Sequence, residues 1–276
     1  MLWAMEVPKV VFRALVQSIL GLALLAPVAA SDLQSGLDAY ARGEFGAALR
    51  VLRPLAEQGD ARAQSRIGTM YVRGEGVARN PEEGVRWYRK AAEQGFVDAQ
   101  VNLGTAYARG EGVAKSDAEA ARWYRRAAEQ GDAEAQATLG LMYEMGIGVR
   151  EDVDKALDWY RRAAVQENPA AQVAMGTLYH RGSGVPRDAA QAAMWFRRAA
   201  EQGDAAGQWL LGRMYAEGDG VTRDVVQAYA WMSLSLAGGD HAGRGALEEL
   251  EARMTAGEIE AARRLSVGLR RGSGVR

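Results

Sequence analysis

The sequence contains no cysteine and only two histidines among its 276 residues. The absence of cysteine excludes disulfide bonds, thiolate metal sites and a cysteine nucleophile, so packing and hydrogen bonds must stabilise the fold. It also suits an oxidising compartment, although a chain of this size can lack cysteine by chance. His180 and His241 have no partner at the i+4 spacing of a helical metal site, so we expect no bound metal.

The chain also lacks an excess of either charge. Its formal net charge is −1, with 25% charged and 48% apolar residues. This composition is typical of a soluble globular protein that buries a continuous core. A chain so close to neutral has no long-range attraction for nucleic acid or anionic lipid, and we expect no nucleic-acid partner.

Long apolar runs are missing except near the N-terminus. Lys9 and Arg13 precede the apolar stretch 14–26, and small residues follow up to Ala30. This is the pattern of a secretory signal peptide, and the run is short for a membrane span. We expect residues 1–30 to be a signal peptide cleaved after Ala30, and the mature protein to be periplasmic or secreted with no integral membrane span. The alternative is an uncleaved N-terminal anchor.

The most informative feature is a fixed step of 36 residues over residues 61–240, along which the same residue types return without an insertion. Such a period is the signature of a repeat architecture, in which each unit buries its apolar faces only by stacking on its neighbours. The step carries Trp87, Trp123, Trp159, Trp195 and Trp231, Tyr71, Tyr107, Tyr143, Tyr179 and Tyr215, Gln64, Gln100, Gln136, Gln172 and Gln208, and Gly68, Gly104, Gly140, Gly176 and Gly212.

Each unit predicts two helices, at about 61–73 and 81–94 in the first unit, joined by a glycine-rich turn. A residue with a hydrogen-bond-accepting side chain caps the second helix, and a Glu or Gln three residues later completes a capping box in four units of five. A glycine then ends the second helix in the left-handed conformation. The caps are Asn80, Ser116, Asp152, Asp188 and Asp224, their partners are Glu83, Glu119, Gln191 and Gln227, and the closing glycines are Gly95, Gly131, Gly203 and Gly239.

A helical period of about 100° per residue divides the first helix into two faces. The recurring positions predict a buried face, and the positions that differ between units predict a free face. On the second helix, an apolar stripe that includes Trp87 and Tyr88 predicts packing of this aromatic pair against small residues of neighbouring helices. In the first unit the buried face comprises positions 63, 64, 67, 68, 70 and 71, and the free face comprises positions 62, 65, 66, 69, 72 and 73.

A longer motif recurs along the chain: Leu-Gly-x-x-Tyr-x-x-Gly-x-Gly-Val, a polar cap, and then Ala-x-x-Trp-Tyr-Arg-Arg-Ala-Ala-Glu-Gln-Gly-Asp. It resembles the Sel-1-like repeat family, a relative of the tetratricopeptide repeat. Residues 103–132 match almost throughout, and the resemblance covers about residues 33–240. It implies an all-α fold, a right-handed α/α superhelical solenoid of helical hairpins, and an adaptor that holds other proteins. It also implies that exported bacterial members are associated with envelope complexes, polysaccharide export and host contact.

The two ends depart from this motif. Residues 31–60 predict a degenerate N-terminal capping repeat with a shorter loop between its helices. After the five repeats of residues 61–240, residues 241–276 predict C-terminal capping helices and a short disordered tail. Within them, residues 242–254 predict one helix, and Thr255 with Glu258 predicts the capping box of another.

Two recurring patterns invite a chemical interpretation that their context does not support. The G-x-G of Gly74-Glu75-Gly76 lies between two helices, not after a strand, so a tight turn is the better interpretation and we expect no cofactor. Paired basic residues such as Arg89-Lys90 form a ladder along the second helices. Glutamate follows Arg89, Arg125 and Arg197 four residues later. That spacing predicts ion pairs on a solvated face rather than a site for a polyanion.

The free face of the first helices is where a binding site is expected, because in tetratricopeptide-like superhelices this helix lines the concave surface. Trp209 stands where the other repeats carry smaller residues, so it is either an interface residue beside Leu210 and Arg213 or a residue packed under the C-terminal helices. Met145 lies on the same face. The predicted partner-binding residues are Arg66, Asn102, Arg109, Leu141, Glu144, His180, Arg181, Trp209, Leu210 and Arg213.

The sequence therefore predicts an exported scaffold that binds a protein or peptide in its concave groove and is not an enzyme. The first alternative is a cell-envelope glycan binder or polysaccharide-export scaffold, in which groove aromatics and arginines contact sugar. A hydrolase of cell-wall or β-lactam-type substrates comes third, because the resemblance links such activity to cysteine-rich relatives and this chain has no cysteine.

Overall fold

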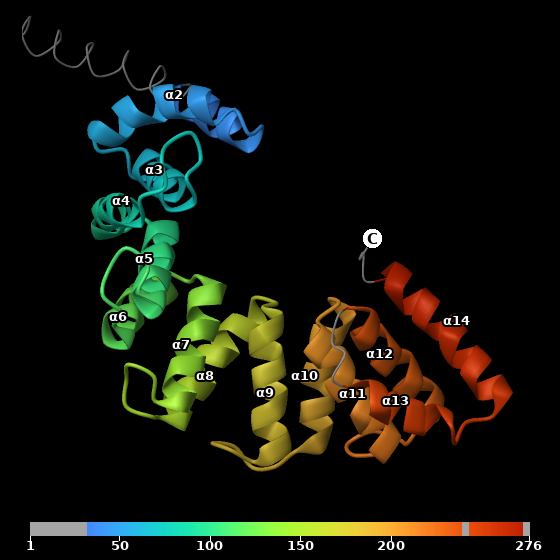
Figure 1. Cartoon of the computed structure of the whole chain (residues 1–276). Coiled ribbons are helices and arrows are strands. Elements are labelled where there is room, and N and C mark those ends of the chain that lie inside the picture. The colour runs from blue at the N-terminus through green and yellow to red at the C-terminus, as the bar shows by residue number, and fades with distance from the viewer. Residues whose placement is uncertain (1–31, 239–242, 273–276) are drawn as a thin grey trace, which may run out of the picture. The chain divides into compact units, whose positions relative to one another are not determined.

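The computed structural model describes residues 32–238 and 243–272, and in these ranges it contains helices and turns but no strand (Figure 1). The predicted signal peptide, the predicted closing residue Gly239 and residues 273–276 lie outside the described residues. The disordered tail predicted for residues 270–276 is wrong in part, because residues 270–272 belong to the last helix. A helical segment over residues 32–41 comes first. The helices that follow are α2 (Phe45–Glu57), α3 (Ala61–Arg73), α4 (Pro81–Glu93), α5 (Val97–Arg109), α6 (Asp117–Glu129), α7 (Ala133–Met145), α8 (Val153–Val165), α9 (Pro169–Arg181), α10 (Ala189–Glu201), α11 (Ala205–Glu217), α12 (Val225–Ala237), α13 (Arg244–Glu251) and α14 (Ala256–Gly272).

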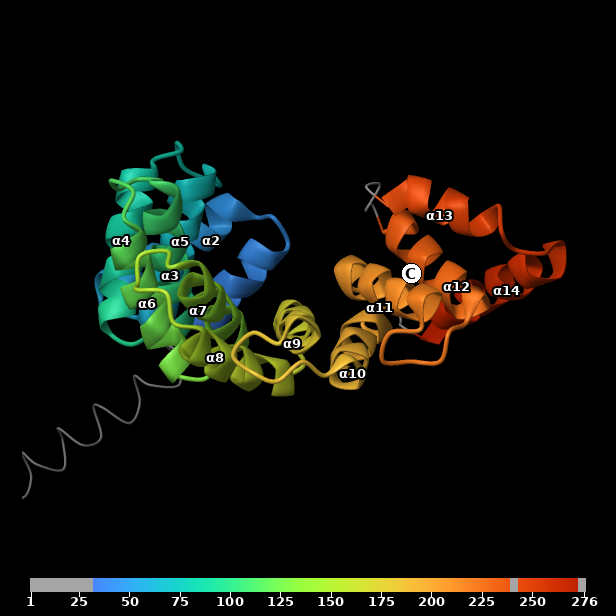
Figure 2. The ribbon, with the colours of Figure 1, turned by 90° about the horizontal axis from the view of Figure 1, so that it is seen from below.

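The all-α fold is an α/α solenoid of helical hairpins, and its contacts divide the chain into two compact units at Ser116 and Asp117. In the first unit α3 packs against α2 and α4, and α4 packs against α5. In the second unit every helix from α7 to α12 packs against the helix before it and the helix after it. The helices α13 and α14 both pack against α12, as Figure 2 shows at the C-terminal end of this unit.

Local signals in the sequence set the ends of these helices. The Asp60 side chain accepts from the Ala63 amide, and Asp132 and Asn168 cap later first helices in the same way. The first helices end at glycines with positive φ, such as Gly146 at 66°. As predicted, glycines with positive φ also follow the second helices, namely Gly95, Gly131 and Gly203.

The predicted capping box at the start of α4 is only half formed. Asn80 Oδ1 accepts from the Glu83 amide as expected, but the Asn80 amide donates to the Tyr71 carbonyl at 2.8 Å rather than to the Glu83 side chain. Glu83 instead pairs with Arg86. The turn folds each cap residue back over the end of the first helix, which therefore supplies the acceptor. The same amide-to-tyrosine bond is formed by Ser116 to Tyr107, Asp152 to Tyr143, Asp188 to Tyr179 and Asp224 to Tyr215.

A complete capping box does form at the start of α14. The Thr255 amide donates to Glu258 Oε2 at 2.7 Å, and the Glu258 amide donates to Thr255 Oγ1 at 3.3 Å. No preceding helix end competes for the Thr255 amide, so the reciprocal pair predicted from the sequence is possible there.

Glycine lets the two helices of a hairpin approach closely. A Cβ atom on Gly140 would lie 2.7 Å from the Tyr160 ring, and one on Gly176 would lie 2.6 Å from the Phe196 ring. Of the predicted buried face of α3, positions 63, 64, 67, 68 and 70 are buried and position 71 is half-buried. The prediction that position 65 lies on the free face is wrong, because Ser65 is also buried.

A buried glutamine joins each repeat to the one before it. Gln136 Nε2 donates to the Ala128 carbonyl of the preceding second helix at 3.0 Å. Gln136 Oε1 in turn accepts from Gln166 Nε2, at the end of its own repeat, at 2.8 Å. The carboxamide thus has partners on both sides although it is only 4% exposed, which explains why a polar residue recurs at a core position.

The predicted ion pairs of the basic ladder are wrong. Arg89, Arg125 and Arg197 donate instead to tyrosine hydroxyls of the next repeat, at 2.9, 2.8 and 2.6 Å. Within the described part of the chain, the glutamates four residues after them form no ion pair. The second basic residue of each pair also has a partner, because its cation lies over the ring of the Trp three residues earlier. Lys90 Nζ, for example, lies 4.2 Å from the centroid of the Trp87 ring.

One turn breaks the glycine rule. Glu167 has φ of 65° at the position where the neighbouring repeats carry Gly131 and Gly203. Side chains with a Cβ atom are strained in this left-handed region by roughly 1 kcal/mol. The turn between α8 and α9 is therefore a local source of instability.

We expect Glu167→Gly to raise the free energy of unfolding by about 1 kcal/mol, because it removes this strain. Urea denaturation followed by circular dichroism measures the change. The matched control is Gly131→Glu, whose Cβ would meet no atom within 4 Å, so only backbone strain should act and the protein should lose a similar amount. Equal stability of both variants and the wild type would contradict the explanation.

Candidate partner-binding site

The free face of the third repeat carries the most exposed apolar side chains of any first helix that the structure describes. Leu141 and Met145 on α7 are 45% and 62% exposed. The next repeat has Thr177 and Arg181 at the equivalent positions, and the repeat before has Thr105 and Arg109. Because the other repeats place polar or charged residues there, the hairpin does not need apolar residues at these two positions.

Glu144 compensates for the loss of threonine at position 141. In the first repeat the Tyr88 hydroxyl donates to Thr69 Oγ1 at 3.1 Å, but leucine offers no acceptor at the same place in the third repeat. There the Tyr160 hydroxyl donates to Glu144 Oε2 at 2.7 Å. Burial, followed by this contact with Glu144, raises the pKa of Tyr160 well above its ordinary value. Glu144 is therefore occupied by a bond inside its own hairpin.

The two predicted residues at the end of α9 differ in whether they have a partner within the protein. His180 Nε2 lies 2.9 Å from an Asp219 carboxylate oxygen in the turn of the following repeat, and Arg187 also donates to Asp219 at 3.0 Å. Arg181 at the end of α9 is exposed, and no hydrogen bond or ion pair involves it among the residues that the structure describes.

The three predicted residues on α11 all have contacts within the protein. Trp209 packs in the cluster that α12 forms with Leu247 and Leu250 of α13. A Cβ atom on Gly243 would collide with the Trp209 ring. Packing under the C-terminal helices, one of the two alternatives for Trp209, is thus what the structure shows. The other two residues are Leu210, which packs against the neighbouring core cluster, and Arg213, which pairs with Glu217 at 3.0 Å.

The remaining predicted residues are Arg66, Asn102 and Arg109, which belong to the first unit. The guanidinium of Arg66 lies 4.2 Å from the centroid of the Tyr40 ring, so it packs on the N-terminal capping segment. Asn102 on α5 is half-buried, and Arg109 at the end of the same helix is exposed. Of these three side chains, Arg109 is the freest to meet a partner.

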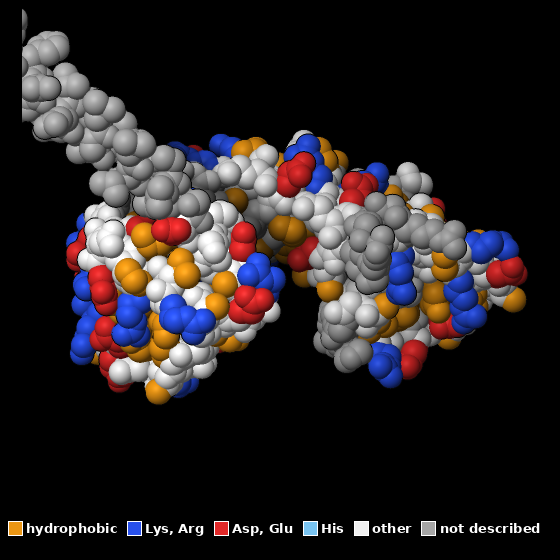
Figure 3. All heavy atoms as spheres, turned by 90° about the horizontal axis from the view of Figure 1, so that it is seen from above, with side chains coloured by type: hydrophobic (Ala, Val, Ile, Leu, Met, Phe, Trp, Pro, Cys, Tyr) orange, Lys and Arg blue, Asp and Glu red, His pale blue; other side chains and the backbone are white. Residues whose placement is uncertain are grey.

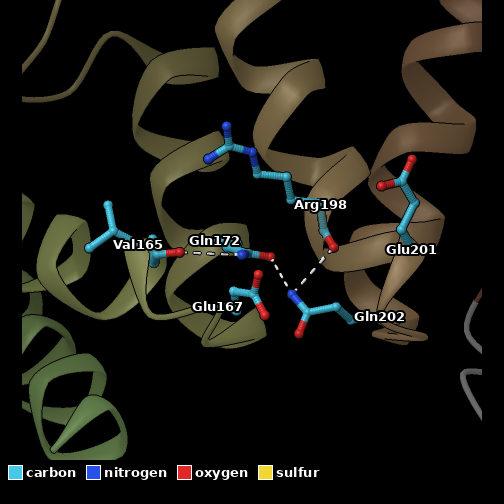
Figure 4. Close-up of a pocket in the computed structure, with 7 residues that line it drawn as sticks. Val165, Glu167, Gln172, Arg198, Glu201 and Gln202 are labelled. Atoms are coloured by element: carbon cyan, nitrogen blue, oxygen red, sulfur yellow. Dashed lines mark hydrogen bonds between the residues drawn. The ribbon is translucent and has the colours of Figure 1, made fainter.

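A pocket of about 380 Å³ opens between α8, α9 and α10 in the second unit (Figure 4). Val165 lines it and is 66% exposed, where most other repeats carry glutamate. Gln172 and Gln202 are bonded to each other at 2.8 Å on its floor. Sequence reasoning missed this pocket, although its signal was present in the departure of residues 165–168 from the Glu-Gln-Gly-Asp pattern.

On the face shown in Figure 3, basic, acidic and apolar side chains are interspersed over each unit. In residues 32–238 and 243–272 no group of three or more His, Asp or Glu side chains is placed to hold a metal ion. None of the helices in these ranges is both long enough and apolar enough to cross a membrane.

Comparison with known proteins agrees with this architecture. The model of the Sel1 repeat matches residues 61–96, 97–132, 133–167, 169–204 and 205–240. The chain belongs to the Sel1 repeat family. The Sel1-like repeat proposed from the sequence motif is therefore confirmed, and with it the solenoid of helical hairpins. No curated protein matches the chain significantly.

Two solved structures are similar to this Sel1 repeat protein over most of its length. A Sel1 repeat protein from Oxalobacter formigenes is 37% identical with a TM-score of 0.73, and the match covers 76% of this chain and 87% of that one. The protein c5321, a protective antigen of uropathogenic Escherichia coli strains with the same repeat fold, is 36% identical with a TM-score of 0.78. That match covers 89% of this chain but only 53% of c5321, so the chain spans about half the length of that relative.

The exchange of acceptors at Tyr160 is testable. We expect Glu144→Ala to lower the free energy of unfolding by about 1–2 kcal/mol, because it leaves a buried hydroxyl without an acceptor. Adding Leu141→Thr should restore most of this loss by recreating the acceptor that Tyr88 uses in the first repeat. The measurement is a double-mutant cycle in urea with the single variant Leu141→Thr as control. Strictly additive effects would contradict the exchange.

Proposed function

We propose that this Sel1 repeat protein is an exported scaffold that binds another protein through the free face of its first helices and has no catalytic activity. The observation that carries the proposal is the exposure of Leu141 and Met145 on α7. Sel1 repeats commonly serve as protein-interaction scaffolds, and this face is where the repeats of the chain differ from one another.

Leu141 and Met145 are exposed in the folded protein, so the free energy of burying them is available to stabilise a complex. Complete burial of one large apolar side chain stabilises a complex by roughly 1.5–3 kcal/mol. Two such side chains one helical turn apart can anchor a segment of a partner, as interface hot spots do. Threonine and arginine at the equivalent positions of the next repeat show that the fold tolerates polar residues there.

A glycan partner has less support than a protein partner. That alternative relies on groove aromatics and arginines, and Trp209, the aromatic residue among the predicted partner-binding residues, packs against the C-terminal helices. The proposed absence of catalytic activity is supported by the family, because Sel1 repeat scaffolds are generally non-catalytic.

The first test of the binding face uses residues that the protein itself places at the equivalent positions. In affinity capture from the native cell envelope, we expect the double variant Leu141→Thr, Met145→Arg to retain about a tenth or less of the partner held by the wild type. Its free energy of unfolding should stay close to that of the wild type. Quantitative mass spectrometry identifies the partner and measures the loss.

The matched control is Met194→Arg on α10, which exchanges another exposed apolar residue of the second unit for the arginine found there in earlier repeats. We expect it to retain the partner fully. Equal capture by the wild type and the double variant would refute the proposed face, and equal loss in both variants would show that only surface hydrophobicity matters.

Export is supported by the signal-peptide pattern of residues 1–30. We expect the protein purified from the native host to come from the periplasm or the culture medium and to begin at Ser31. Cell fractionation followed by N-terminal sequencing measures both. A chain that keeps residues 1–30 in the membrane fraction would support an anchor instead, and a cytoplasmic chain would refute export.

A further inference from the structure

We infer that the last repeat contains an open site, formed by α10, α11, α12 and α14, for a small ligand that joins an apolar body to a primary amide. The site consists of residues other than those of the proposed partner-binding face, so the inference does not depend on the proposed function. It follows from a hydrogen bond that other repeats form and the last repeat lacks.

The missing bond belongs to the row of buried glutamines. In the fourth repeat Gln172 Oε1 accepts from Gln202 Nε2 at 2.8 Å. In the last repeat Gln208 Nε2 donates to the Ala200 carbonyl at 3.3 Å, but the position equivalent to Gln202 is Gly238. Among the residues that the structure describes, nothing donates to Gln208 Oε1. The first and third repeats form the bond, from Gln94 to Gln64 at 2.7 Å and from Gln166 to Gln136 at 2.8 Å.

The backbone at Gly238 does not require glycine. Its φ and ψ are −78° and −1°, and those of Gln202 are −83° and 0°. A Cβ atom on Gly238 would come no closer than 3.3 Å to a neighbouring atom, the carbonyl oxygen of Ser235. The last repeat therefore has the backbone of the other repeats at this position, and only the side chain that would donate is absent.

The unsatisfied oxygen of Gln208 faces a cavity. Gln208 is only 6% exposed, and it lines a cavity of about 330 Å³, a size typical of small-molecule sites. Gln208 Oε1 is not one of the fully enclosed atoms without a partner, which among the described residues are Arg66 Nε and the Nε1 atoms of Trp87 and Trp195. Because a buried acceptor without a donor costs free energy, a ligand that donates to Gln208 Oε1 gains from a bond that the protein leaves unmade.

The other walls of the cavity are mainly apolar. Trp231 and Leu234 of α12 belong to one core cluster, and Leu269 of α14 packs against it. Leu269 and its neighbour Gly268 line the cavity, and neither of them has a side chain that can donate a hydrogen bond. Figure 1 shows α14 alongside α12, which it contacts. The last helix thus covers the apolar wall without replacing the missing donor.

The polar atoms of the lining indicate which head group fits. Gln208 Oε1 and the carboxylate of Glu201 can only accept hydrogen bonds, and Gln208 Nε2 is already bonded to Ala200. The ligand must therefore donate. In the repeats that form the bond, the donor is the primary amide of a glutamine, and we assign the same group to the ligand.

The charges on the surrounding helices do not favour an ion over this neutral group. α12 carries no charged residue, and Arg213 and Glu217 of α11 pair with each other. Beside the cavity, α10 and α14 carry both signs, because the lining residue Glu201 follows Arg197 and Arg198, and Arg270 follows the lining residue Leu269. Burial of an ion also costs much more than burial of an amide.

The inference is tested by titrating the purified, isotope-labelled protein with hexanamide and recording NMR spectra. The comparison compounds are N,N-dimethylhexanamide, which has no N–H group, and hexylamine, which is a cation at neutral pH. We expect hexanamide to shift the signals of the Gln208 side chain and the Trp231 indole. It should bind about fivefold more tightly than either comparison compound, because only hexanamide supplies a neutral donor.

Two variants close the site in different ways. Gly238→Gln supplies the missing donor from the protein, and Gly268→Leu fills the cavity from α14, where a Cβ atom would meet nothing within 4 Å. We expect each to weaken hexanamide binding about tenfold or more. The matched controls are Gly238→Ala, which adds no donor, and Gly257→Leu, at an equally open position of α14 that does not line the cavity. Both controls should bind within about twofold of the wild type.

Three results of the titration would overturn the inference: equal binding of hexanamide and its dimethyl counterpart, tighter binding of hexylamine, or no binding of any compound. The last result would mean that only water enters the cavity. Unchanged binding by Gly238→Gln and Gly268→Leu would overturn it as well. Because Gly268→Leu replaces a glycine inside a helix with a good helix former, this variant should fold even if Gly238→Gln does not.

Discussion

The close approach of the two helices of each hairpin at a glycine is the constraint on which the rest of the structure depends. A methyl group on Gly140 would collide with the Tyr160 ring, and one on Gly176 would collide with the Phe196 ring. Because the Tyr160 ring packs against the first helix of its hairpin, its hydroxyl reaches Glu144 on the free face of that helix. The core contact therefore decides which residues at the surface must provide a hydrogen-bond acceptor.

The third repeat shows how the core and the surface are coupled. With Thr69 available, Tyr88 is satisfied and the neighbouring surface position can be apolar, as Val72 is. With leucine at position 141, the acceptor moves to Glu144 and the leucine is released from any role in the core. An apolar residue can thus occupy an exposed position without loss of a buried hydrogen bond, which makes a binding surface compatible with a stable repeat.

The 36-residue period predicted the hairpins, the helix ends and the buried glutamines because these depend on local sequence and on equivalence between repeats. The capping boxes and the basic ladder were predicted less well. The capping-box rule and the i, i+4 ion-pair rule describe an isolated helix. In the solenoid the Tyr71 carbonyl accepts a hydrogen bond from the Asn80 amide, and the Tyr107 hydroxyl accepts one from Arg89. Both competing groups come from another helix, so helical spacing alone does not reveal them.

The candidate site was predictable in outline but not residue by residue. The helical period assigned Leu141, His180 and Arg181 to the free face, and the structure agrees. The helical period did not reveal the contact between His180 and Asp219, because that aspartate lies in the turn of the next repeat. Trp209 was ambiguous for a related reason, since the last repeat has no successor and the C-terminal helices cover it instead.

Residues at equivalent positions of the five repeats show which side chains the fold requires, and exposure alone does not. All five repeats impose nearly the same backbone on a given position, so a residue that another repeat replaces at no cost to its hairpin is not required by the fold. His180 and Glu144 also differ from their equivalents, yet their contacts with Asp219 and Tyr160 explain them. Leu141 and Met145 differ from their equivalents in all the other repeats and have no such contact, and this is why the proposed partner-binding face is centred on them.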